Sequence, residues 1–240
     1  MSADDFQIRM PPNVQSVRIG EHQVVFIDDF LEDPRALFEA ACASEFKPYP
    51  GVVERKGYPG MRAKMPAGYS ANLTALMEPL IRLNFAVPEE LPLRKSECAF
   101  SLTTVQPQML GPLQRTPHFD SSTPHHMAVL LYLCGEEHGG TAFYRHKATG
   151  LQQITRARSE RFLDLYYEEI NAIHPKARYF DDSNEHFEFL ALMPARFNRL
   201  VIYRGSLLHT AVIDPGSSIS NDPRTGRLTA NSFYDFGVQS

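Results

Sequence analysis

The sequence predicts a mainly β domain of the barrel or sandwich type, flanked by helices. Short β-prone segments separated by turn residues follow one another from residue 98 to the C-terminal end, which is the pattern of an all-β fold. Two amphipathic helical segments precede them. At 240 residues, with 43% hydrophobic and 22% charged residues, the chain has the size and composition of one globular domain. We therefore expect a single domain over residues 1–240.

The first part of the chain, residues 1–97, is expected to hold N-terminal strands and supporting helices. Residues 17–19 and 23–27 have the composition of strands. Asp33 followed by Pro34 predicts the start of a helix, because proline suits the first helical turn. The expected apolar face of this helix consists of Leu37, Phe38 and Ala41.

A second helix is expected after Ser70, because apolar residues recur there at spacings of three and four. These residues are Leu73, Leu76, Met77, Leu80 and Ile81. Between the two helices, residues 47–69 show no periodicity and predict a loop, of a length often found in lids over pockets. Its basic side chains are interpreted either as a solvated surface or as a means of steering an anionic substrate. They are Arg55, Lys56, Arg62 and Lys64.

The β core is expected over residues 98–240. Its predicted strands are residues 99–105, 128–133, 141–144, 199–203 and 228–236. An insertion at about residues 145–190 interrupts the series, with a helix over roughly residues 159–171. The apolar face of that helix carries Phe162, Leu165, Tyr166 and Ile170.

Composition also limits the partners and the location of the protein. A formal net charge of −4 offers no basic field for a phosphate backbone, so we expect no nucleic-acid partner. The N-terminal residues are acidic and no apolar run approaches membrane-spanning length, which favours a cytoplasmic protein without a membrane partner. No heptad or similar pattern indicates an oligomeric state. The three cysteines are widely spaced and are interpreted as small buried hydrophobes: Cys42, Cys98 and Cys134.

One short segment carries the pattern of a metal site. His118 and Asp120 lie two residues apart in a stretch that can be extended, which places both side chains on one face. His209 lies in an apolar context and supplies a third ligand. Two histidines and one carboxylate leave open positions on iron(II), as non-haem oxygenases require. The alternative is a hydrogen-bonded structural trio. The other histidines of this region are interpreted as polar loop or strand-edge residues: His125, His126, His138 and His146.

An arginine at the start of the last strand predicts an anion site. Arg227 and Thr229 share a strand face, and a buried guanidinium there can form a bidentate pair with a dicarboxylate. Arg224 is the competing candidate, but it lies in a turn-rich segment and is expected to be exposed to solvent.

These motifs, taken in order, resemble the iron(II)/2-oxoglutarate oxygenases, nearest to the prolyl-hydroxylase-like branch. That branch shows a His-x-Asp, an apolar strand ending in Tyr-Leu, a Gly-Gly turn into another strand, a distal histidine and an arginine on the final strand. Here the corresponding residues are His118 and Asp120, Tyr132 and Leu133, Gly139 and Gly140, His209, and Arg227. The gap from His209 to Arg227 is longer than usual in the branch, and a turn-rich loop over residues 214–223 accommodates the extra length.

The resemblance implies a double-stranded β-helix core, of the jelly-roll or cupin-like kind. It implies iron(II) at His118, Asp120 and His209, and the distal carboxylate of 2-oxoglutarate on Arg227 and the Tyr132 hydroxyl, with a further hydrogen bond from Thr229. The implied activity is a dioxygenase that hydroxylates its substrate and releases succinate and carbon dioxide.

Two other functions stay open from the sequence. One is a catalytically silent metal-binding or regulatory module of the same fold, and the other is a cupin-like metalloenzyme that does not use 2-oxoglutarate. The oxidised substrate, a small molecule or a peptide, is not specified, because specificity lies in loops such as residues 47–69 and 145–190.

Overall fold

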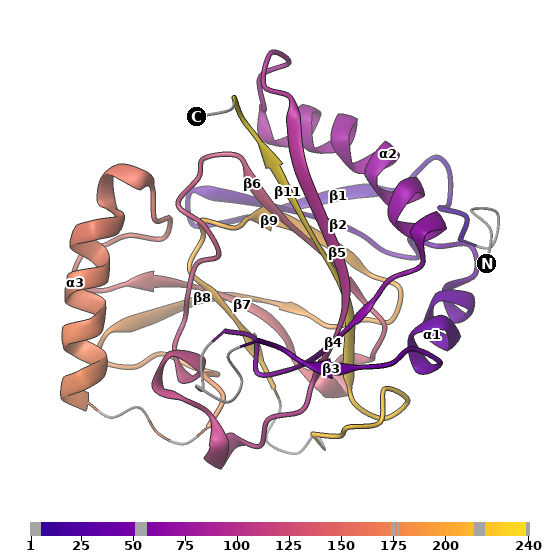
Figure 1. The fold of residues 1–240 in the computed structure, drawn as a ribbon. Coiled ribbons are helices and arrows are strands. Elements are labelled where there is room, and N and C mark those ends of the chain that lie inside the picture. Colours follow the sequence, from indigo (N-terminus) through magenta and orange to yellow (C-terminus); the bar gives the residue numbers. More distant parts are fainter. Residues whose placement is uncertain (1–5, 51–56, 174–175, 177, 214–218, 239–240) are drawn as a thin grey trace.

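Two antiparallel β-sheets form the centre of the computed structural model, which describes residues 6–50, 57–173, 176, 178–213 and 219–238 (Figure 1). The large sheet has the strand order β1-β2-β9-β6-β11-β5-β4-β3 and the small sheet the order β10-β7-β8. The strands of the large sheet are β1 Val14–Ile19, β2 His22–Ile27, β3 Lys47–Pro48, β4 Gly60–Lys64, β5 Leu93–Thr103, β6 His126–Tyr132, β9 Leu200–Arg204 and β11 Arg227–Phe236. Those of the small sheet are β7 Gly140–His146, β8 Phe187–Pro194 and β10 His209–Val212.

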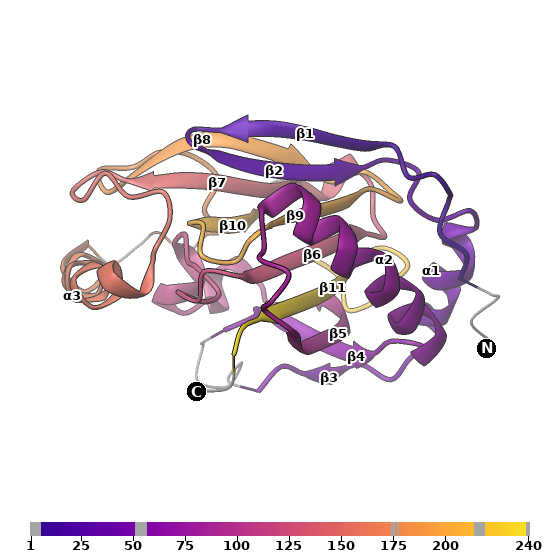
Figure 2. The ribbon, with the colours of Figure 1, turned by 90° about the horizontal axis from the view of Figure 1, so that it is seen from above.

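Helices cover the sheets from opposite sides. Helices α1 (Pro34–Cys42) and α2 (Ala67–Phe85) lie at one end of the molecule and α3 (Arg156–Ile173) at the other, as Figures 1 and 2 show. Among the described residues, no helix combines the length and apolar character needed to cross a membrane. Short 3-10 helices complete the order: η2 Pro107–Met109, η3 Pro112–Arg115 and η4 Glu136–His138.

The central strands are buried on both faces, which explains their nearly continuous apolar sequence. In β6, Met127, Val129 and Leu131 belong to the core under α1 and α2, whereas Leu130 and Tyr132 belong to the core that includes residues of the small sheet. Successive side chains of a strand point to opposite faces, so one strand serves two cores. A third core lies between α3 and the small sheet.

The helices bear out most of the expectations from periodicity. Asp33 caps α1, accepting from the backbone N–H groups of Arg35 and Ala36, as the Asp33-Pro34 pair predicted. Helix α2 begins at Ala67, before the expected start after Ser70, and its first turn already buries Tyr69. Helix α3 is longer than the predicted residues 159–171.

The predicted loop over residues 47–69 is wrong in part, because it contains β3, β4 and the first turn of α2. Strand β4 pairs with β5, with Gly60 opposite Thr103. Such long-range pairing stabilises strands whose own sequence has little β character. Residues 51–56, with Arg55 and Lys56, lie outside the described residues.

Two further boundaries and one burial prediction need correction. Strand β5 begins at Leu93 rather than at residue 99, and β8 occupies the end of the expected insertion over residues 145–190. Of the three cysteines only Cys134 is buried, whereas Cys42 and Cys98 are half-buried; all three are free thiols.

Strand β11 has an unusual inner face for a central strand. Four of its five outer residues join the core under α1 and α2, but its inner residues include Arg227, Thr229, Asn231 and Asp235. Burying polar side chains on the inner face of a central strand costs free energy unless they have hydrogen-bond or charge partners. The polar inner face of β11 therefore indicates a ligand site in the space between the two sheets.

Candidate functional site

A pocket of about 650 Å³ lies between the two sheets. Strands β4, β5, β6 and β11 of the large sheet contribute to its walls, as do β7 and β10 of the small sheet and one face of α3. A concave site of this size, lined by both apolar and polar groups, has the dimensions of a small-molecule site. His118, Asp120, His209 and Arg227 all line this one pocket.

The backbone holds the first histidine segment directly against the second. His118 and His209 form an antiparallel bridge, with N–H to carbonyl distances of 2.9 and 2.8 Å. The Asp120 N–H donates to the Gly205 carbonyl at 2.7 Å. Asp120 is thereby held beside the turn that leads into β10, so residues far apart in the sequence form one site.

His118, Asp120 and His209, named here the open cluster, bring three ligand atoms together without bonding them to one another. His118 Nε2 lies 3.8 Å from Asp120 Oδ1, and His209 Nε2 lies 3.6 Å from Asp120 Oδ2. These separations exceed those of hydrogen bonds. One ligand atom from each residue lies within 4.8 Å of the others. Because metal ligands lie about 2.0–2.2 Å from an ion, donor atoms around it are spaced by about 3–4 Å.

The tautomer of His209 and the neutral state of both imidazoles suit the binding of a cation. The His209 Nδ1–H donates to the Leu207 carbonyl at 2.9 Å, which leaves the lone pair of Nε2 toward Asp120. Desolvation within the pocket lowers the pKa of His209 and of His118 to about 4, so both rings are neutral near pH 7. Desolvation also raises the pKa of Asp120, and a divalent ion favours its ionised form. Two neutral imidazoles and one carboxylate fit a divalent iron ion.

Arg227 is a buried cation with an incomplete set of partners. The residue is 4% exposed, and its Nη2 donates to the Gly140 carbonyl at 3.1 Å. Its Nε is buried and has no hydrogen-bond partner. No carboxylate of the described residues lies within ion-pair distance of it. A buried guanidinium with an unmatched N–H suits an anionic ligand, and its fork geometry suits a carboxylate.

The two other predicted co-substrate residues lie close to Arg227 but differ in orientation. The ring of Tyr132 is 5.7 Å from the Arg227 guanidinium carbon, and its hydroxyl is 2.7 Å from Thr141 Oγ1. Thr141 lines the pocket, whereas Tyr132 and Thr229 do not. The Thr229 hydroxyl donates to the Ser101 carbonyl at 3.4 Å.

Arg224 lies elsewhere, as its turn-rich context predicted. It is exposed and pairs with Glu39 at 2.7 Å. The part of the loop over residues 214–218 lies outside the described residues.

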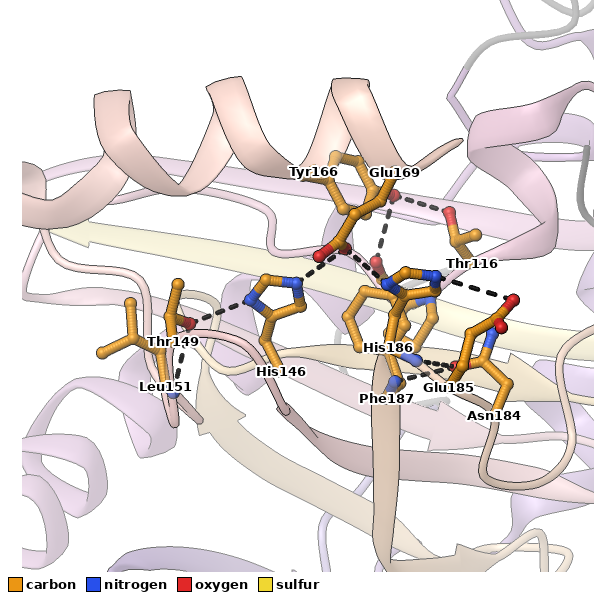
Figure 3. Close-up of polar contacts among 11 residues, drawn as sticks. Thr116, His146, Thr149, Leu151, Tyr166, Glu169, Asn184, Glu185, His186 and Phe187 are labelled. Atoms are coloured by element: carbon orange, nitrogen blue, oxygen red, sulfur yellow. Dashed lines mark hydrogen bonds and ion pairs between the residues drawn. The ribbon is translucent and has the colours of Figure 1, made fainter. Parts of the chain in front are cut away.

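Helix α3 supports the open cluster, which the sequence did not indicate. The Tyr166 hydroxyl donates to the Pro117 carbonyl at 3.1 Å and lies 2.6 Å from Thr116 Oγ1 (Figure 3). Both partners directly precede His118. Phe119 packs edge-on against Phe162 of the same helix. The helix therefore holds the His118 segment in place while it forms one wall of the pocket.

A second group of histidines and a carboxylate fastens α3 to the small sheet. Glu169 Oε2 accepts a hydrogen bond from His146 Nε2 at 2.8 Å and lies at ion-pair distance, 3.1 Å, from His186 Nδ1 (Figure 3). His146 Nδ1 lies 2.9 Å from the Thr149 hydroxyl. We name His146, Glu169 and His186 the closed cluster. The interpretation of His146 as a loop or strand-edge residue is wrong, because its side chain is fully buried.

The sequence did not indicate the place of several residues in the pocket. His126 is half-buried, and its Nδ1 lies 2.7 Å from Asp235 Oδ1, so it is more than a polar strand-edge residue. Asn231 also lines the pocket and keeps a buried Oδ1 without a partner. The alternation of polar residues along β11 was the available signal. Gly205 allows the close approach of His126, because a Cβ there would lie 2.4 Å from the His126 ring.

Comparisons with known proteins give a family match and several remote structural likenesses. No curated protein matches the chain. Similar solved structures include an N-substituted L-amino acid dioxygenase from Burkholderia ambifaria AMMD, with a TM-score of 0.42, 11% identity and coverage of 91% of this chain and 87% of that chain. A complex of such a dioxygenase with alpha-KG has a TM-score of 0.31, 12% identity and coverage of 89% and 81%. An oxidoreductase of the 2OG-Fe(II) oxygenase family from Burkholderia pseudomallei has a TM-score of 0.34, 11% identity and coverage of 94% and 74%.

At these TM-scores the likeness between the folds carries no conclusion about the reaction. The family match is of a different kind, because a family profile described as a family of unknown function (DUF6445) covers residues 10–234. The chain belongs to this DUF6445 family.

Proposed function

We propose that the protein is an iron(II)- and 2-oxoglutarate-dependent dioxygenase that hydroxylates a small-molecule or peptide substrate. One observation carries the proposal: the open cluster and the buried, incompletely bonded Arg227 line the same pocket. A metal site alone suits many enzymes. A metal site that shares a pocket with a buried guanidinium suits a co-substrate that chelates the metal and carries a second carboxylate.

In this proposal His118, Asp120 and His209 hold iron(II), and Arg227 binds the distal carboxylate of 2-oxoglutarate. When bound, the iron activates dioxygen, and the oxidation converts 2-oxoglutarate to succinate and carbon dioxide while the substrate gains a hydroxyl group. The protein contributes ligand geometry, a fixed co-substrate orientation and a pocket that limits access of water. Tyr132 supports Arg227 through its ring and holds the Thr141 hydroxyl at the pocket wall. Thr229, whose hydroxyl donates to the Ser101 carbonyl, stays the predicted source of a further hydrogen bond to 2-oxoglutarate.

The two facing sheets would then form a double-stranded β-helix, within one domain over residues 1–240. The order of the motifs supports a place near the prolyl-hydroxylase-like branch of this superfamily. Cytoplasmic location and the absence of nucleic-acid and membrane partners remain expectations from composition.

An anaerobic titration of the metal-free protein tests the proposal. Iron(II) is added first and 2-oxoglutarate second, and the weak visible charge-transfer band of the bidentate chelate is recorded. We expect the band in the wild-type protein. In His209→Ala it should be absent because iron is not held, and in Arg227→Gln the 2-oxoglutarate concentration needed for the band should rise at least about tenfold.

Arg224→Gln is the matched control, because it removes a guanidinium that pairs with Glu39 at the surface. It should leave the band and its titration unchanged. Iron binding without a band would remove 2-oxoglutarate from the proposal and would favour a metal-binding module or a cupin-like enzyme. Aerobic turnover is then measured as succinate formed.

A further inference from the structure

A second arginine lines the pocket, on strand β4, which lies between β5 and the edge strand β3 of the large sheet. Arg62 lies in the middle of β4, where it pairs with Ser101 of β5, and its side chain reaches the pocket that holds the open cluster. His118 and Asp120 of the open cluster line the same pocket. Arg62 thus belongs to the same chemical environment as the metal ligands.

Two tyrosine rings flank the Arg62 guanidinium. Its central carbon lies 4.6 Å from the ring centre of Tyr49 and 5.4 Å from that of Tyr58, and the two rings meet edge to face. Cation–π contacts stabilise the faces of a guanidinium and leave its in-plane N–H groups available. The Tyr58 hydroxyl lies 3.0 Å from Thr103 Oγ1, which keeps that ring in place.

The N–H groups of Arg62 have no anionic partner among the described residues. Its Nε is buried without a hydrogen bond, and no described carboxylate lies within ion-pair distance. Two acidic groups at the same pocket are engaged elsewhere: Asp235 bonds to His126, and Glu97 pairs with Lys95. The third, Asp120, belongs to the open cluster. An arginine outside the pocket, Arg199, is by contrast held by Asp28 at 2.6 Å. A partly desolvated guanidinium without a counter-charge favours an anion supplied by a ligand.

The wall formed by α3 and the segments that it holds is apolar and aromatic. It is contributed by Leu113, Phe119, Phe162, Leu163, Tyr166 and Tyr167. A substrate that uses this wall needs an apolar body, and a substrate that uses Arg62 needs an anionic group.

We propose that Arg62 is the substrate-binding residue for a carboxylate, so that the protein oxidises a small carboxylic acid with an aromatic or aliphatic body. The pocket then has two carboxylate anchors with separate roles, Arg227 for the co-substrate and Arg62 for the substrate. The inference rests on the proposed function, because these roles are defined relative to bound 2-oxoglutarate.

Arginine side-chain NMR tests this division in the full-length protein. The protein carries 15N-labelled arginine and zinc(II) in place of iron(II), so that no turnover takes place. The Nε–H signals of Arg62 and Arg227 are assigned from Arg62→Lys and Arg227→Lys. We expect 2-oxoglutarate to shift the Arg227 signal. With 2-oxoglutarate saturating, phenylacetate should shift the Arg62 signal, and its uncharged analogue phenylacetamide should not.

Variants separate binding from folding. Arg62→Gln should weaken phenylacetate binding at least about tenfold and leave 2-oxoglutarate affinity within about twofold of wild type, because only one charged hydrogen-bonding site is lost. Arg62→Lys keeps the charge and should be intermediate, and Arg224→Gln should match wild type. If Arg62→Gln proves unfolded in its NMR spectrum, the Arg62→Lys comparison decides.

Three results would overturn the proposal. They are equal binding of phenylacetate and phenylacetamide, unchanged phenylacetate affinity in the Arg62 variants, and a shift of the Arg62 signal by 2-oxoglutarate itself. A failure of 2-oxoglutarate to shift either arginine signal would instead count against the proposed function. The two failures are therefore distinguishable.

Discussion

The open and closed clusters contain the same chemical groups, two imidazoles and one carboxylate, in opposite arrangements. In the closed cluster the Glu169 carboxylate lies in direct contact with both rings, with a hydrogen bond of 2.8 Å to His146 and an ion-pair distance of 3.1 Å to His186. In the open cluster the corresponding distances from Asp120 are 3.8 and 3.6 Å. The closed cluster holds its carboxylate against both rings and fastens a helix, whereas the open cluster leaves lone pairs directed into a shared gap. The distance between the carboxylate and the imidazoles, rather than the identity of these groups, distinguishes a structural contact from a candidate metal site.

The largest effect that this comparison predicts is on metal affinity. His209→Ala should lower iron(II) affinity by more than about 100-fold, because one of three ligands is lost and even supporting residues of metal sites contribute 10- to 100-fold. His186→Ala, in the closed cluster, should bind iron(II) as wild type does. Calorimetric titration under anaerobic conditions measures both. Equal losses in the two variants would remove the distinction between the clusters.

Stability should show the opposite order. His146→Ala is expected to cost about 3 kcal/mol of unfolding free energy, because it removes a fully buried ring and leaves Glu169 with one partner fewer. His118→Ala in the metal-free protein should cost less than about 1 kcal/mol, since its ring makes no short side-chain bond. Urea unfolding measures the difference. A larger loss for His118→Ala would mean that the open cluster is itself a structural fastening.

Helix α3 connects the two clusters, and Tyr166→Phe tests that connection. The variant keeps the ring stacked on Phe162 but loses the bonds to Pro117 and Thr116. We expect a loss of about 1 kcal/mol in stability and about tenfold in metal affinity. The control is Tyr167→Phe, because Tyr167 is 48% exposed. This variant should change neither the stability nor the metal affinity. An unchanged metal affinity in Tyr166→Phe would show that α3 does not position the His118 segment.

A pH dependence of the metal-free protein is also expected. The pKa of His118 and of His209 lies at about 4 in the folded chain, below the ordinary value of 6.5. Between these values only the unfolded chain takes up the two protons, so unfolding free energy should fall as pH falls from 6.5 toward 4. Below about 4 this contribution should level off. The double variant His118→Asn/His209→Asn should have a flatter profile in urea unfolding over this range, and an unchanged slope would contradict the pKa shifts.

The sequence predicted which residues meet at the open cluster better than it predicted the residues that support them. His118, Asp120 and His209 were recognisable because their spacing, order and apolar context are local features. Arg62 was identified only as one of several basic residues, because β4 owes its existence to pairing with β5, and such pairing leaves little trace in a short segment. The roles of Tyr166 and His146 depend on where α3 docks, which periodicity does not reveal. Periodicity predicted which face of α3 is buried but not that this face packs on the small sheet.

The most direct test of the distinction between the two clusters is an anaerobic crystal soaked with iron(II), in which the anomalous signal at the iron edge locates the metal. We predict one strong peak within about 2.0–2.2 Å of ligand atoms of His118, Asp120 and His209, and none at Glu169. A peak at the closed cluster, or no peak beside Asp120 in a crystal that binds iron elsewhere, would contradict the account.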